Sequence, residues 1–139
     1  MTIYTSYFAK IKQLPEHIVP VSICGKAPEW YKGLQYKKLA PKWDFFAKWK
    51  ETHDNDYYID CFNKQVLSNL NAWLVIKDII SLMNLADFPD LKDMCLVCYE
   101  KPSDFCHRHL VADWLNKNGI ECIEYEFDDT MGVQTGREQ

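Results

Sequence analysis

A strand, a short loop and a helix follow one another within residues 94–118, and this unit constrains the fold more than any other part of the chain. The apolar run 94–99, MCLVCY, is typical of a buried strand. Pro102 breaks the run, and Ser103 stands where the N-cap of a helix over 104–118 belongs. In open α/β sheets ligands bind where a strand passes into the next helix, so we expect the functional site here.

A second strand is predicted directly after this helix. Asn118 and Gly119 are typical of a helix C-terminus. Residues 120–127 then alternate between two faces, which favours a strand with one wetter face near the edge of a sheet. The two faces carry Ile123, Tyr125 and Phe127 on one side, and Cys122, Glu124 and Glu126 on the other.

The whole pattern predicts a single α/β domain over residues 1–127, followed by a polar and flexible tail over 128–139. We expect a small, mostly parallel sheet of about four strands with helices packed on it. The other predicted strands lie at 3–8 and 18–24, and a loop follows over 25–39. Helices are predicted from Pro41 onward, over 55–71 with Asp54 or Asn55 as its cap, and over 72–83. Pro20 indicates that the strand 18–24 either lies at the edge of the sheet or begins at that residue.

Composition limits the classes of partner. The net charge is −4, which argues against binding of nucleic acid through bulk positive charge but leaves room for a mononucleotide or another small anion. No apolar run is long enough for a transmembrane helix, and the first residues do not resemble a secretory signal, so we expect a cytoplasmic protein with no membrane partner and with reduced thiols. The oligomeric state is left open.

The loop and the start of the predicted helix concentrate reactive side chains. We expect Glu100, Cys106 and His107 to be catalytic, because a carboxylate, a thiol near a helix N-terminus and an imidazole supply a base, a nucleophile and an acid. Arg108 offers a fork of donors to phosphate or carboxylate, and Cys98 ends the strand beside it, so both are expected to bind substrate.

Each of these residues also has a structural interpretation. Arg108 pairs with Glu100 or Asp104 in the simplest one, and Cys106 packs against the sheet as a small apolar side chain. Cys95 and Cys98 match C-x-x-C, but residues three apart in a strand point to opposite faces, so Cys95 is interpreted as a core residue.

A zinc site is the metal-binding alternative at the same junction. Cys98, Cys106, His107 and His109 are local candidates for it, but no second paired motif completes the set. We therefore expect no metal and no other cofactor.

Other strand ends should reach the same edge of a parallel sheet. Ser6 and Tyr7 end the first strand, and Lys26 follows the second, so these three residues are candidate substrate contacts, together with Trp30. The aromatic residues at near-helical spacing further along are interpreted as a core stripe rather than a binding surface: Trp43, Phe46 and Trp49.

Three stretches of the chain resemble family 488 of the domains of unknown function: IYTSYFAK, VPVSICGKAPEWYKG with KKLAPKWDFF, and above all LVCYEKPSDFCHRHLVADWL. The resemblance runs from about Ile3 to Tyr125. The family motif Cys-x-Glu…Cys-His-Arg falls on Cys98, Glu100, Cys106, His107 and Arg108. The resemblance implies a small bacterial or bacteriophage protein with an α/β fold and a pocket built on that motif, and it implies no substrate.

These observations favour an enzyme that acts on a nucleotide or another phosphorylated or anionic small molecule at the junction 98–108. Two alternatives stay open. One is a module that binds a nucleotide or a protein without chemistry, such as a phage accessory protein. The other is a cysteine-based redox or metal site.

Overall fold

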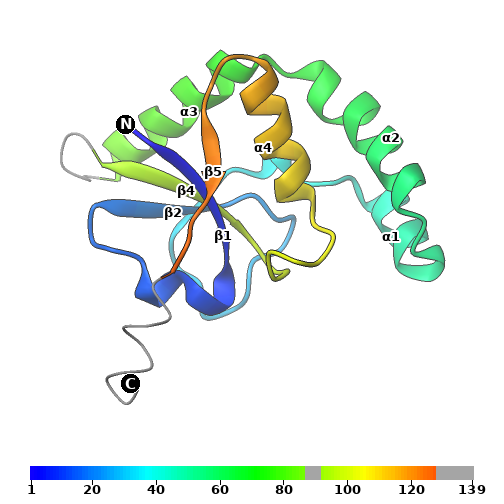
Figure 1. Cartoon of the computed structure of the whole chain (residues 1–139), viewed down its shortest axis with the longest axis horizontal. Coiled ribbons are helices and arrows are strands. Elements are labelled where there is room, and N and C mark those ends of the chain that lie inside the picture. The colour runs from blue at the N-terminus through cyan, green and yellow to red at the C-terminus, as the bar shows by residue number, and fades with distance from the viewer. Residues whose placement is uncertain (87–91, 128–139) are drawn as a thin grey trace.

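The structure is a computed structural model that describes residues 1–86 and 92–127, so the predicted tail over 128–139 lies outside the described residues. At its centre is a sheet of five parallel strands: β1 (Ile3–Tyr7), β2 (Ile18–Ser22), β3 (Leu34–Gln35), β4 (Asp93–Cys98) and β5 (Cys122–Glu124). Their order is β3-β2-β4-β1-β5 (Figure 1). This confirms the predicted α/β fold, makes the sheet entirely parallel and adds one strand to the predicted four.

The register of the central strands places their carboxyl ends side by side. β4 pairs with β1 on one side, where Tyr7 lies opposite Cys98, and with β2 on the other, where Ser22 lies opposite Val97. β4 is buried from Met94 onward, as its apolar sequence predicts. The reactive end of β4 is therefore flanked by the ends of two other strands.

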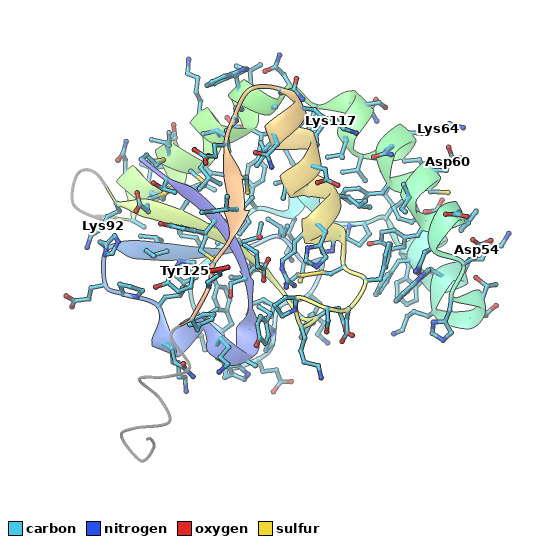
Figure 2. All side chains as sticks on the ribbon, in the orientation of Figure 1. Asp54, Asp60, Lys64, Lys92, Lys117 and Tyr125 are labelled. Atoms are coloured by element: carbon cyan, nitrogen blue, oxygen red, sulfur yellow. A yellow bond between two sulfur atoms is a disulfide. The ribbon has the colours of Figure 1, made fainter. Side chains whose placement is uncertain are left out.

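Four α-helices connect and cover the strands: α1 (Trp43–Thr52), α2 (Asn55–Gln65), α3 (Ala72–Leu85) and α4 (His107–Lys117). The predicted cap of α2 is confirmed, because the Asp54 carboxylate accepts a hydrogen bond from the Tyr57 amide at 3.1 Å at the outer end of the helix (Figure 2). In residues 1–86 and 92–127 no single helix meets the length and hydropathy expected of a membrane span, although the segments 55–69 and 72–85, bent by 73°, meet them as a pair.

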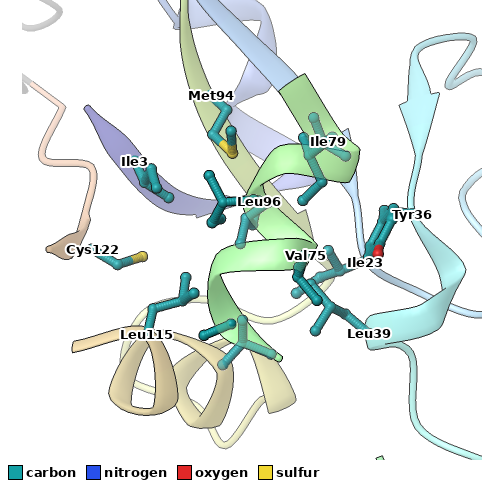
Figure 3. Packing of buried hydrophobic residues seen from close by; sticks show 14 of the residues in the cluster. Ile3, Ile23, Tyr36, Leu39, Val75, Ile79, Met94, Leu96, Leu115 and Cys122 are labelled. Carbon is teal, nitrogen blue, oxygen red and sulfur yellow. The ribbon is translucent and has the colours of Figure 1, made fainter. Parts of the chain in front are cut away.

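The main core lies on one face of the sheet, under the helices. Ile3, Met94 and Leu96 project from the strands toward Val75 and Ile79 of α3, with Leu115 of α4 beside them (Figure 3). The opposite face has a smaller apolar cluster that includes Phe8, at the start of the 3-10 helix η1 (Phe8–Gln13), and Tyr31 from the loop between β2 and β3. The helices are thus distributed unevenly about the sheet.

α4 begins later than predicted. Ser103 is not its cap: residues 101–104 form a turn in which the Asp104 amide donates to the Lys101 carbonyl at 3.0 Å. Cys106 occupies the N-cap position in an extended conformation, with φ −156° and ψ 143°. The cause is tertiary, because Phe105 packs between Trp49 and Tyr58, with ring centroids 5.6 and 5.0 Å away, and so holds the preceding chain out of the helix.

Several other predicted boundaries differ from the structure. The loop 25–39 contains the short strand β3, and the helix predicted over 55–71 ends at Gln65 and continues as the 3-10 helix η3 (Leu67–Asn69). Pro20 lies in the middle of β2 rather than at its start; it is tolerated because β3 pairs only with Val21 and Ser22. α1 begins two residues after Pro41, with Lys42 as its N-cap. Gly119, with φ 81°, confirms the predicted stop of α4.

Candidate functional site

A cavity of about 280 Å³ lies at the carboxyl ends of β2 and β4, on the side toward α1 and α2. One side of it is formed by residues that the family motif predicts: Cys98, Glu100, Cys106 and His107. Cys24 and Lys26, which follow β2, extend that side, and aromatic side chains form the opposite wall. The strand-to-helix junction therefore borders a cavity, although Arg108 is not part of the lining.

Cys98 and Cys106 face each other across the loop between β4 and α4. Their sulfur atoms are joined as a disulfide, and both residues are buried. Their Cα atoms are 7.5 Å apart, whereas most protein disulfides hold this distance between about 4.4 and 6.8 Å. The sulfur pair that the redox and metal alternatives require is thus brought together. Cys95 is fully buried in the core, as predicted, and it precedes Cys98 by three residues in β4, so the two side chains point to opposite faces of the sheet.

His107 is buried, and its hydrogen bonding fixes its tautomer. Nε2 lies 2.8 Å from the carbonyl oxygen of Ile23, and since a carbonyl only accepts, Nε2 carries the proton. Nδ1 is left with its lone pair, 3.9 Å from Sγ of Cys106. Burial lowers the pKa of His107 to about 4, so the ring is neutral at pH 7. His107 therefore presents an unprotonated nitrogen to the sulfur pair.

Arg108 is fully buried and does not line the cavity. Nη1 donates to Sγ of Cys98 at 3.1 Å and to the backbone carbonyl of Glu100 at 2.5 Å. Nε and Nη2 donate to the carboxylate of Glu124 at 3.1 and 2.9 Å. The structural interpretation of Arg108 was right about an ion pair but wrong about the partner, and the expected direct contact of Arg108 with a substrate anion finds no support in this arrangement.

The residues at the end of β1 also lie behind the cavity rather than in its lining. The Tyr7 ring lies 5.7 Å from the Arg108 guanidinium, and Ser6 is fully buried with no hydrogen-bond partner for its hydroxyl within the described residues. Neither lines the cavity, and Trp30 packs against Phe8 on the other face of the sheet. Of the candidate contacts at the other strand ends, Lys26 is the one that borders the cavity.

The aromatic residues of α1 line the cavity, and their interpretation as a core stripe was right only in part, since Phe46 and Trp49 are half-buried and pack against the main core. Trp43, Phe46 and Trp49 all border it, and the Trp43 side chain is 70% exposed. Phe45, on a different face of the same helix, is the α1 residue buried in the core. The stripe is real, but it faces a solvent-accessible space because α1 lies beside the sheet edge. Tyr58 of α2 and Phe105 complete the wall.

Sequence reasoning missed several contributors to this site, among them Tyr58, Phe105 and Glu124. Tyr58 and Phe105 gave no separate signal, because single aromatic residues are common in cores. Glu124 was placed on a wetter face of the last strand, but it turns inward to Arg108 while Ile123 is 46% exposed. No local pattern signals Glu124, because the requirement of Arg108 for a carboxylate partner follows from its burial, which only the structure shows.

Comparisons with known proteins agree with this description. The chain matches the family model described as the active DUF488-N3 subclade over residues 7–119, a span that contains the whole cavity lining and confirms the resemblance found in the sequence. No curated protein matches the chain, and no solved structure matches it. The word active in this description suggests a catalytic protein, and it says nothing of the substrate. The chain therefore belongs to the DUF488 family, in the active DUF488-N3 subclade.

Proposed function

We infer that the cavity is the active site of an enzyme that acts on a small molecule with a flat ring and an anionic group, as in a nucleotide. The observation that carries this proposal is the composition of the cavity. It has an aromatic wall on one side and, on the other, the sulfur pair of Cys98 and Cys106, an imidazole, a carboxylate and an amine. Clusters of this kind at the end of a parallel sheet are typical of catalytic sites.

The aromatic wall supports recognition of a planar ring. Trp49 stacks near-parallel to Phe46, with an interplanar angle of 15°, and lies 5.6 Å from Phe105. A base that stacks on such side chains gains about 1–3 kcal/mol, whatever its hydrogen-bonding edge. The exposed Trp43 leaves part of this aromatic surface open to a ligand.

Lys26 supports recognition of the anionic group. Among the cavity-lining residues of the described chain, it is the one with a permanent positive charge, and it is exposed. The hydroxyl of Tyr99 donates to the Lys26 carbonyl at 2.6 Å, which holds this segment against the end of β4. The phosphate contact that the sequence suggested for Arg108 is thus assigned to Lys26 instead.

Glu100 and Cys106 are the two candidates for the chemistry. Glu100 is exposed in the cavity lining, where its carboxylate can exchange a proton with a bound molecule. Reduced Cys106 can act as a nucleophile whose proton passes to Nδ1 of His107, which lies 3.9 Å from its sulfur. In both cases Arg108 is a positioning residue, because its hydrogen bonds hold the sulfur of Cys98 and the backbone carbonyl of Glu100 in place.

A ligand screen followed by product analysis tests the proposal. The reduced protein is screened by thermal shift against nucleoside mono-, di- and triphosphates, and each stabilising compound is incubated with the protein and analysed by mass spectrometry. We expect stabilisation and conversion; Glu100→Gln and Cys106→Ser should keep the melting temperature, and at least one of them should lose conversion. Glu121→Gln, an exposed glutamate outside the cavity, is the matched control.

The other outcomes of the screen are equally informative. Stabilisation without any product would favour the binding module. No stabilisation by any nucleotide would overturn the proposed substrate class. If Glu100→Gln and Cys106→Ser both unfold, the two side chains serve the stability of the fold rather than catalysis.

A further inference from the structure

Three side chains with nitrogen or sulfur donors converge at the floor of the cavity. The ligand atoms of Cys98, Cys106 and His107 all lie within 4.8 Å of one another, and all three residues are buried. They come from the end of β4, the N-cap of α4 and its first residue, so the turn between strand and helix creates the cluster. Two thiolates and an imidazole are a ligand set that zinc uses in proteins.

His107 is already oriented as a metal ligand. Histidines that bind metals donate their other ring N–H to a carbonyl or carboxylate, which fixes the tautomer and the ring orientation. Here Nε2–H is held by the Ile23 carbonyl at 2.8 Å, and Nδ1 points toward the sulfur of Cys106. A neutral imidazole with a free lone pair beside a sulfur is the form that coordinates a cation.

The spacing of the donors suits a bound ion. With Zn–S of about 2.3 Å and Zn–N of about 2.0 Å, tetrahedral coordination separates S from N by about 3.5 Å. Nδ1 of His107 and Sγ of Cys106 are 3.9 Å apart. The Cα separation of 7.5 Å between the two cysteines leaves room for the sulfurs, once reduced, to turn apart and hold an atom between them.

Arg108 supplies the surroundings that a thiolate ligand needs. Its Nη1 donates to Sγ of Cys98 at 3.1 Å, and a sulfur accepts such a bond far better as a thiolate than as a thiol. The charge of Arg108 is balanced by Glu124. Two thiolates with a divalent cation therefore leave the buried site neutral, whereas two thiolates without a cation would bury two negative charges.

We propose that the reduced protein binds one divalent soft cation, with Zn²⁺ as the first candidate, through Sγ of Cys98, Sγ of Cys106 and Nδ1 of His107. No fourth such side chain joins the group in residues 1–86 and 92–127. Because all three ligands line the cavity, the remaining coordination position faces it and is open to water or substrate, as in catalytic rather than structural zinc sites.

The site would supply a Lewis acid beside Glu100, and it would leave Glu100 as the group that transfers protons. This inference does not depend on the nature of the substrate, and it is tested without one. The disulfide and the metal are alternative states of the same two sulfurs.

The test uses the full chain, reduced with a phosphine and freed of metal with a chelator. Titration with Co²⁺ should saturate at one equivalent, with sulfur-to-cobalt charge-transfer absorption and the intense visible bands of tetrahedral cobalt, and Zn²⁺ should displace it. Cys98→Ser and Cys106→Ser should each weaken the charge-transfer band. Each should also reduce affinity beyond the roughly 10- to 100-fold that loss of an outer-shell partner costs. His107→Ala should reduce affinity similarly but keep the charge-transfer band.

Two controls make the test specific. Cys24→Ser removes another thiol that lines the cavity, one whose sulfur faces the Val97 carbonyl at 3.9 Å, and it should leave the titration unchanged. Oxidation of the unmodified protein with diamide should abolish binding, and reduction should restore it, which tests the site even if a variant fails to fold.

Three results would overturn the proposal: no cobalt retained by the reduced protein, equal loss in Cys24→Ser and Cys98→Ser, or undiminished binding by the oxidised protein. None of these outcomes bears on the nucleotide screen, so failure of the metal site and failure of the proposed function can be told apart.

Discussion

Arg108 and Glu124 form a two-pronged ion pair between α4 and β5, with Nε and Nη2 donating to the two carboxylate oxygens at 3.1 and 2.9 Å. The arginine side chain has no exposed surface, and the glutamate side chain is 26% exposed. The Thr5 hydroxyl also donates to Glu124, at 2.6 Å. This arrangement ties the helix that begins at the site to the edge strand, and it aims the remaining donors of Arg108 at Cys98 and at the backbone of Glu100.

Glu124→Gln should destabilise the protein by about 3 kcal/mol, because it leaves a buried guanidinium without its counter-charge. Asp60→Asn is the matched control: Asp60 pairs with Lys64 on the exposed surface of α2 (Figure 2), where the loss should stay below about 1 kcal/mol. Urea unfolding monitored by circular dichroism measures both. Equal losses in the two variants would show that Arg108 does not depend on Glu124.

Trp43→Ala should weaken the binding of a planar ligand by roughly 5- to 150-fold, which corresponds to about 1–3 kcal/mol of stacking energy. Its effect on stability should be small, since Trp43 is 70% exposed. Trp73→Ala, on α3, removes a tryptophan that is 57% exposed and does not line the cavity. Isothermal titration of the unmodified protein and the two variants, with the nucleotide that gives the largest thermal shift, measures these affinities. A similar loss of affinity in Trp73→Ala would show that the aromatic wall does not bind the ligand.

Thiol reactivity should follow burial and pairing. Burial raises the pKa of Cys95 and raises that of Cys122 to about 12, so iodoacetamide at pH 7.5 should leave both unmodified in the folded protein. Cys61, half-buried on α2, should react, and Cys98 and Cys106 should react only after reduction. Peptide mass spectrometry before and after reduction reads out each site. Modification of Cys98 without reductant would mean that the pair is open under those conditions.

Stability should fall in alkaline solution, partly because of Cys122. Its pKa is about 12 in the folded protein, against about 8.5 in an unfolded chain, so between these values only the folded state retains the proton. The free energy of unfolding should then decrease with rising pH by about 1.4 kcal/mol per pH unit for this group. Cys122→Ala should remove that share of the slope above pH 9, while other buried groups such as Tyr31 and Tyr58 retain theirs. Urea unfolding at a series of pH values measures the slopes; identical slopes would contradict the assignment.

The sequence predicted the sheet and the position of the site because both depend on local patterns. The apolar run of β4 and the breaker Pro102 mark a strand end without reference to the rest of the chain. Parallel strands then bring their carboxyl ends to one edge, which places Lys26 and Cys98 together.

The partners of the site residues could not be predicted in the same way, because they are set by tertiary packing. The start of α4 depends on Phe105 packing with α1 and α2, which no pattern within 94–118 reveals. The partner of Arg108 was sought among near neighbours, Glu100 and Asp104, but it comes from β5, 16 residues away. The α1 aromatics were interpreted only as core for the same reason: periodicity shows that a face is apolar, but not that a cavity lies opposite part of it.

The cavity draws its two sides from separate stretches of the chain, since the reactive groups lie at the β4–α4 junction and the aromatic wall comes mainly from α1 and α2. Under the proposed function, mutations in α1 and α2 should therefore change which molecules bind in the cavity, while the reactive groups at the β4–α4 junction stay in place. Under the proposed function, members of the subclade that share the Cys-x-Glu…Cys-His-Arg motif would differ in selectivity through the residues of α1 and α2. Exchanging residues 43–58 between two members is the direct way to transfer selectivity from one to the other.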